Sequence, residues 1–187
     1  MIMATKRIVT KIGDVFCAEI DGQYKRFFQY FAIDSTQLNS SVIRVFKRHY
    51  PMDYVPVISD IVVGSVEFYA HTMLKGGITA NAWYKIGKSS VLVDLQNIIF
   101  RVSEDYGSEV TKSERWYIWN LNEPMIFVGK LPSKYYSADL GSIMPYIAIC
   151  NRLRFGKYTH FLFLIHSRIS ERMNIFGHMS SYIYNMN

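Results

Sequence analysis

Glu67 and His71 are the two side chains whose types and spacing best suit acid–base chemistry in this 187-residue chain. Four positions apart, they would share a face of either a helix or a strand, and a carboxylate beside an imidazole can transfer protons. A surface pair at a sheet edge explains the same spacing with fewer assumptions. The sequence therefore leaves open whether Glu67 and His71 have any catalytic role.

The histidines and cysteines do not form a metal-binding motif. No two histidines have the i, i+4 spacing of a zinc helix, and neither Cys17 nor Cys150 belongs to a CxxC pair. Cys17 lies in an alternating strand pattern, which indicates a packed and unreactive thiol. The glycines at 76 and 77 lack the Lys-Ser/Thr of a phosphate loop. We expect no enzyme activity, no metal and no cofactor.

Two clusters of side chains could bind a partner. One is basic and lies at the C-terminal end of a predicted helix, where the helix dipole also favours cations. The other is aromatic, and its tryptophans suit a core as well as an interface. The residues that we take as candidates for partner binding are Trp116, Trp119, Tyr135, Tyr136, Arg152 and Arg154.

The composition describes a basic globular chain. It is 50% hydrophobic and 16% aromatic, which excludes a disordered chain, and its net charge is +6. The excess is +2 up to Asp105 and +4 after it. Such a charge suits an acidic partner or a solvated basic surface. No apolar stretch reaches the roughly 20 residues of a membrane span, and no targeting segment is visible. We expect a cytoplasmic protein without membrane contact.

Alternation with period two predicts strands through the first part of the chain. Residues 14–20 and 23–33 flank Asp21-Gly22, a strong signal for a two-residue hairpin. The stretch 61–72 favours a strand with a bend at Gly64, and 75–77 favours a turn. Further strands are predicted at 41–47, 83–87 and 91–102. This spacing predicts a curled antiparallel sheet or a small SH3-like barrel.

The polar stretch 105–109 is the best candidate for a domain boundary, giving domains 1–105 and 106–187. The second part reads as a β-α-β extension packed on the first, with a flexible end from about residue 179. Its one convincing helix spans 143–154, with Ser142 as a cap, Pro145 in the first turn and Gly156 closing it. Its other predicted elements are strands at 115–121, 125–131 and 158–165, and a short helix at 167–176. The fold class expected is α+β, predominantly β.

Several short motifs resemble the immunity protein 26 family of bacterial polymorphic-toxin loci. The opening from Lys11 to Phe16, followed by Asp21-Gly22-Gln23-Tyr24, resembles the start of that family. The stretches 83–87, 116–122, 129–131 and 152–158 are also similar to its members. The resemblance covers about residues 6 to 165. It implies a cytosolic, non-catalytic protein that neutralises a cognate toxin by stoichiometric binding, and it supplies no catalytic residues.

The positive net charge separates this chain from acidic immunity proteins that bind basic nucleases. A toxin bound by this chain would be acidic, or the contact would be mostly apolar. The alternative is a nucleic-acid-binding β module, because aromatic and basic residues interleave between Tyr24 and Tyr30. The sequence also leaves open an enzyme and a homodimer.

Overall fold

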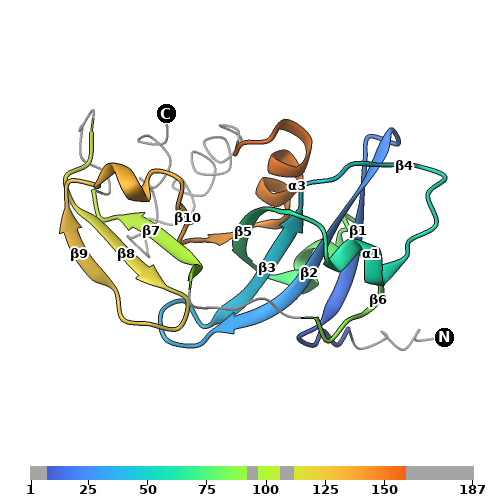
Figure 1. Cartoon of the computed structure of the whole chain (residues 1–187), viewed down its shortest axis with the longest axis horizontal. Coiled ribbons are helices and arrows are strands. Elements are labelled where there is room, and N and C mark those ends of the chain that lie inside the picture. The colour runs from blue at the N-terminus through green and yellow to red at the C-terminus, as the bar shows by residue number, and fades with distance from the viewer. Residues whose placement is uncertain (1–7, 92–96, 106–111, 159–187) are drawn as a thin grey trace, which may run out of the picture.

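The computed structural model describes residues 8–91, 97–105 and 112–158, and the chain in these ranges is mostly β. Two open sheets lie side by side, with α3 above the first sheet and the second sheet at one end (Figure 1). The predicted predominance of β structure is therefore confirmed, and the sheets are open. The strand predicted at 158–165, apart from its first residue, the helix predicted at 167–176 and the end from 179 lie outside the described residues.

The first sheet has seven strands in the order β11-β5-β3-β2-β1-β6, with β4 beside β2. All neighbours are antiparallel except β11 and β5, which are parallel. Its strands are β1 (Asp14–Ile20), β2 (Tyr24–Asp34), β3 (Ser40–Phe46), β4 (Tyr50–Pro51), β5 (Val66–Thr72), β6 (Tyr84–Lys88) and β11 (Ile143–Met144).

The second sheet has four strands in the order β10-β7-β8-β9, of which β10 and β7 are parallel. Its strands are β7 (Ile99–Ser103), β8 (Trp116–Asn120), β9 (Ile126–Gly129) and β10 (Asp139–Leu140). The predicted strands at 115–121 and 125–131 are confirmed as β8 and β9. The division predicted at residue 105 falls between β7 and β8, which pair with each other along their whole length.

The helices of the described residues are short. They are α1 (Ile58–Val62), α2 (Leu74–Thr79), α3 (Tyr146–Phe155) and the 3-10 turn η2 (Ser133–Tyr135). None of them is long and apolar enough to cross a membrane.

The hairpin between β1 and β2 forms as predicted. Asp21 and Gly22 both have positive φ, at 54° and 65°, and the Gln23 N–H bonds to Ile20 O at 2.9 Å. Ile20 pairs with Tyr24, so the loop holds three residues, one more than predicted. The turn therefore sets the register in which β1 and β2 pair.

Two predictions from local pattern were wrong. Residues 61–72 are not one strand, because Ile61 and Val62 end α1 and both are buried against the sheet. The predicted bend at Gly64 is the turn between α1 and β5, where its N–H bonds to Ile61 O at 3.1 Å. The predicted turn at 75–77 is the middle of α2.

The helix predicted at 143–154 begins three residues later. Pro145 has extended backbone with ψ at 155° and is the N-cap, so Ser142 does not cap the helix. The two residues before Pro145 form β11 instead, which is consistent with the extended conformation that a following proline favours. The predicted end is confirmed, since Gly156 is left-handed with φ at 73°.

The core of the described residues has four clusters: two on opposite faces of the first sheet, one between the two sheets, and a small one around Trp116. The helices α2 and α3 cover one face, where Leu153 and Ile149 pack with Phe28. The helix α1 covers the opposite face. A β-bulge at Phe31, which lies between the paired residues Tyr30 and Ala32, redirects the end of β2. Phe31 consequently packs with the second sheet.

Candidate functional site

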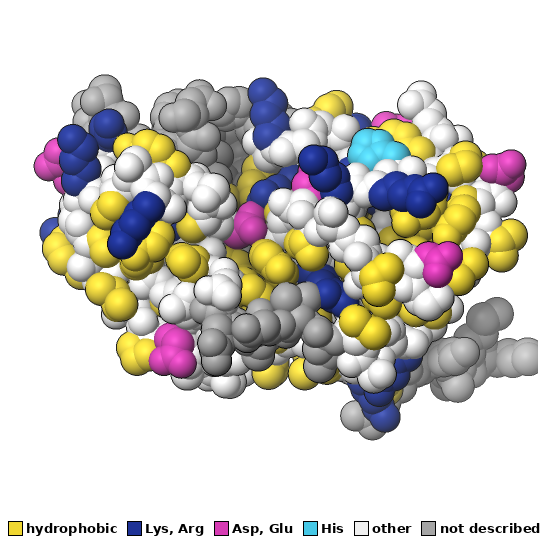
Figure 2. All heavy atoms as spheres, in the orientation of Figure 1, with side chains coloured by type: hydrophobic (Ala, Val, Ile, Leu, Met, Phe, Trp, Pro, Cys, Tyr) yellow, Lys and Arg dark blue, Asp and Glu magenta, His cyan; other side chains and the backbone are white. Residues whose placement is uncertain are grey.

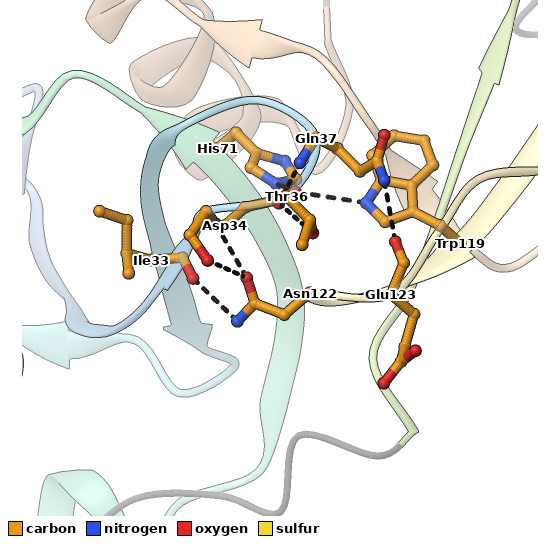
Figure 3. Close-up of polar contacts among 9 residues, drawn as sticks. Ile33, Asp34, Thr36, Gln37, His71, Trp119, Asn122 and Glu123 are labelled. Carbon is orange, nitrogen blue, oxygen red and sulfur yellow. Dashed lines mark hydrogen bonds and ion pairs between the residues drawn. The ribbon is translucent and has the colours of Figure 1, made fainter.

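A buried carboxylate joins the two sheets. Asp34 at the end of β2 accepts hydrogen bonds at Oδ2 from His71 Nε2 of β5, at 2.9 Å, and Trp119 Nε1 of β8, at 3.2 Å (Figure 3). Its Oδ1 accepts a bond from the Gln37 backbone N–H at 2.9 Å. All three side chains of this Asp34 cluster (Asp34, His71 and Trp119) are buried.

The charge states of the Asp34 cluster follow from its geometry. Burial acts to raise the pKa of Asp34, but the hydrogen bonds from Gln37, His71 and Trp119 outweigh it and lower this pKa. Burial lowers the pKa of His71 despite the carboxylate beside it. An ionised Asp34 therefore accepts from a neutral imidazole that carries its proton on Nε2. His71 Nδ1 is buried and has no hydrogen-bond partner among the described residues.

The predicted acid–base pair of Glu67 and His71 does not form. Both lie on β5, but Glu67 forms an ion pair with Arg26, whereas His71 bonds to Asp34. The predicted surface position at a sheet edge is wrong for His71, which is buried and paired with Ile143 of β11. Glu67 is exposed and lies before the part of β5 that β11 covers. Both partners lie on β2, Arg26 near its start and Asp34 at its end. Glu67 and His71 therefore bond to opposite ends of β2 and not to each other.

A second carboxylate ties α3 to both sheets. Asp139 of β10 accepts from Arg152 Nη2 at 2.9 Å and from the Tyr69 backbone N–H at 2.8 Å. The Arg152 guanidinium also lies 3.8 Å from the centre of the Phe68 ring. The side chain of Arg152 is only 18% exposed. It is therefore occupied by contacts inside the molecule.

Arg26 forms a third link, at the other end of the first sheet. Its Nη1 donates to Leu153 O of α3 at 3.1 Å and to His49 Nε2 at 2.8 Å. Its Nη2 donates to Phe46 O at 3.1 Å and pairs with Glu67. The guanidinium is buried, so these bonds hold β2, β3, β5 and α3 together around one charge.

His49 is an exposed member of this group. Its ring stacks on Tyr24, with centroids 4.6 Å apart and planes 8° from parallel. A guanidinium can only donate, so Nε2 must be the acceptor and the neutral ring carries its proton on Nδ1. Burial and the charge of Arg26 lower the pKa of His49. The ring is thus held in place as a neutral hydrogen-bond donor.

The end of α3 completes an exposed surface beside His49. Arg154 pairs with Asp21 at the hairpin turn, and both side chains are about 40% exposed, 41% and 42%. The Phe155 side chain next to it is 55% exposed. We call Tyr24, His49, Arg154 and Phe155 the α3-end surface. Dark-blue Lys and Arg side chains flank a cyan histidine in this region, near α3 and β4 (Figure 2).

The structure separates the six candidates for partner binding. Trp116 and Trp119 are buried, which agrees with the core alternative that the sequence left open for the tryptophans. Trp116 donates its indole N–H to Ser113 O at 3.1 Å. Half-buried Tyr135 packs against the cluster of Trp116, and Tyr136 beside it is exposed. Only Arg154 lies on the α3-end surface.

Sequence reasoning missed Asp34, Arg26 and His49. Arg26 alternates with Phe28 and Tyr30, so the sequence pattern placed it on the same face of the strand as these core residues. The pattern could not predict its bonding partner Leu153, which is 127 residues away. Among the residues that the structure describes, no three His, Cys, Asp or Glu side chains are placed to hold a metal ion.

No family model matches this chain, and neither a curated protein sequence nor a solved structure matches it significantly.

Proposed function

We propose that this chain is a non-catalytic, cytoplasmic protein-binding module of the immunity type, which neutralises a cognate toxin by stoichiometric binding. The observation that supports the proposal is that charged side chains bond to other segments of the same chain. Asp34, Asp139 and Arg26 each bond to at least two other segments of the chain. They serve as internal links, which favours a rigid scaffold over a site that turns over substrate.

A rigid scaffold suits an inhibitor that acts by occupying a surface. Side chains that are already held in place lose little conformational entropy on binding, so more of the contact energy appears as affinity. His49 is held in this way by Arg26 and Tyr24. The resemblance of the opening to the immunity protein 26 family gives the proposal its biological setting.

The net charge of +6 directs the proposal toward an acidic toxin surface. Complementary charge raises the rate of encounter and selects against partners of the same sign. The pairing of Arg154 with Asp21 is exposed and available for exchange. We therefore expect association with the toxin to slow as salt concentration rises.

The alternative of nucleic-acid binding is weaker in this geometry. It depends on aromatic side chains of residues 24–30 that stack on bases, and Phe27, Phe28 and Tyr30 are buried in the core. Tyr24 is half-buried, with His49 stacked on its ring. The sheet thus presents no open row of rings to a single strand.

The test is co-expression with the protein encoded beside this chain. Expression of that protein's toxic domain should stop growth, this chain should restore growth, and calorimetry on the purified pair should give a 1:1 complex. An unrelated toxin that this chain does not counteract is the control for specificity. Growth arrest that persists with this chain present, together with no complex in calorimetry, would contradict the proposal.

A further inference from the structure

We propose that the α3-end surface is where the partner binds, and that it takes an acidic segment of the partner protein carrying an apolar side chain. This inference rests on the proposed function, because it names the surface and the chemistry that such a module would use. The four residues come from three segments distant in sequence, and the contacts of Arg26 and Asp21 hold them together.

His49 supplies a hydrogen-bond donor of fixed direction. Arg26 Nη1 occupies Nε2 at 2.8 Å, which leaves the Nδ1–H of the exposed ring to bond outward. Stacking on Tyr24 fixes the plane of the ring. A group that can only donate at this position selects an acceptor, and a carboxylate is the strongest acceptor that a protein partner offers.

Arg154 supplies a cation that can change partners. Its ion pair with Asp21 is exposed to water, and such pairs contribute little to stability. A carboxylate of the partner can therefore replace Asp21 at low cost, and two parallel bonds to a guanidinium would fix its orientation. Arg152, only two positions earlier, is held by Asp139 and the Phe68 ring and is not available in this way.

Phe155 supplies the apolar contact. Its ring is more than half exposed at the end of a helix, with the Arg154 guanidinium 5.6 Å from the ring centre. Aromatic side chains, phenylalanine included, are enriched in protein interfaces relative to the rest of the surface. Three further cations in the same segments, Lys47, Arg48 and Lys157, are also exposed and add to the charge that an acidic segment would meet.

The chain offers a matched control for each exposed group. Phe127 is 55% exposed, the same as Phe155, but lies on β9 of the second sheet. Arg115 forms an exposed pair with Glu104, as Arg154 does with Asp21, and also lies in the second sheet's part of the chain. Equal effects at both places would mean that any exposed ring or charge matters.

The first experiment measures affinity for the toxic domain encoded beside this chain. The double variant Arg154→Gln/Phe155→Ala should bind at least about tenfold more weakly than wild type, while Arg115→Gln/Phe127→Ala should stay within about twofold. All four side chains are exposed, so both variants should fold, and thermal unfolding checks this. If the first variant binds like wild type, the surface is wrong while the proposed function stands.

A second experiment addresses the surface without the toxin. In amide NMR titrations at low salt, poly-L-glutamate should shift the signals of His49, Arg154 and Phe155, and the double variant Arg154→Gln/Phe155→Ala should lose these shifts. Oligothymidylate of equal charge is the comparison. No shifts with poly-L-glutamate, or tighter binding of oligothymidylate at the same residues, would overturn the acidic-protein assignment. Failure of the toxin to bind would instead count against the proposed function.

Discussion

At the scale of single residues, Asp34 carries a negative charge where water cannot reach it. A buried charge is tolerated when hydrogen bonds replace its hydration, and Asp34 has donors from Gln37, His71 and Trp119. Trp119 stands 85 positions from Asp34 in the chain. Burying the carboxylate costs free energy, but its hydrogen bonds to His71 of β5 and Trp119 of β8 connect the two sheets.

Replacing Asp34 with Asn should destabilise the protein strongly. An amide oxygen in the place of Oδ2 can still accept from His71 and Trp119, but the NH2 group then takes the place of Oδ1 and faces the Gln37 backbone N–H. Whichever way the amide is turned, at least one buried donor loses its acceptor. We expect the free energy of unfolding in urea to fall by about 2–3 kcal/mol. Asp21→Asn is the matched control, because its ion pair with Arg154 is exposed and asparagine tolerates its positive φ. It should change stability by less than about 1 kcal/mol, and equal losses would contradict the role given to burial.

His71 makes stability depend on pH in a predictable direction. Its pKa is lowered in the folded protein from an ordinary 6.5, so the unfolded chain takes up a proton first as pH falls. The contribution of His71 is complete above pH 6.5 and is lost as pH drops toward the folded pKa. Urea unfolding from about pH 7.5 to about pH 5 should therefore show falling stability.

The variant His71→Gln isolates this contribution. The glutamine amide keeps an N–H for Asp34 but does not titrate. The difference in free energy of unfolding between wild type and variant should therefore become smaller as pH falls. The lowered pKa of Asp34 reduces stability only below the ordinary value of 3.8, which is outside this pH range. A pH profile for His71→Gln that runs parallel to the wild-type profile would show that His71 is not the titrating group.

At the scale of elements, α2 shows how packing decides what a glycine does. Gly76 and Gly77 suggest a turn from sequence, yet both lie in the helix Leu74–Thr79. A Cβ on Gly77 would fall inside the Trp83 indole, whereas one on Gly76 would meet only Tyr146 Cδ1 at 3.9 Å. Gly77 is thus required by close packing against Trp83, while Gly76 is not.

The two neighbouring glycines should respond in opposite directions to alanine. Gly77→Ala must displace Trp83 from the core and should lower the melting temperature, at a cost of about 1–3 kcal/mol. Gly76→Ala gains helix propensity in open space and should stabilise by up to about 1 kcal/mol. Thermal unfolding by circular dichroism measures both, with tryptophan fluorescence reporting on Trp83. If both variants are destabilised, α2 is closely packed at Gly76 as well as at Gly77, which would contradict this prediction.

Elements with strong local chemistry could be predicted from the sequence, and those set by packing could not. The Asp21-Gly22 turn and the Gly156 helix end each require positive φ, which the residue type reveals. The stretch from Ile58 to Val62 has the β-branched composition of a strand, and its helix forms because burying Ile61 and Val62 against the sheet outweighs that preference.

At the scale of the whole molecule, the contacts of the α3-end surface also could not be predicted from local sequence. Arg154 was identified because cations at a helix end are visible in sequence, but its partner Asp21 is 133 positions away. His49 was missed because nothing near it in the chain distinguishes it from an exposed loop residue. Its significance comes from Arg26 and Tyr24, which only the folded sheet brings to it.

The two sheets depend on each other across the whole molecule, and this bears on the division predicted at residue 105. The strand β7 lies before that position and its partner β8 after it. The helix α3, also after it, buries Ile149 and Leu153 against the first sheet. Asp34 needs the indole N–H of Trp119 from β8. Each sheet thus completes its core with residues from beyond the division.

A fragment of residues 1–105 should consequently fail to fold alone. Without α3, the apolar face around Phe28 would meet water, and β7 would have an open edge on each side. Its amide NMR spectrum should show narrow dispersion and its urea transition should lose cooperativity, with the full chain as the reference. A well-dispersed spectrum and a cooperative transition would instead show that the contacts of Asp34 and α3 join two parts already able to fold, and that the division at residue 105 is a true domain boundary.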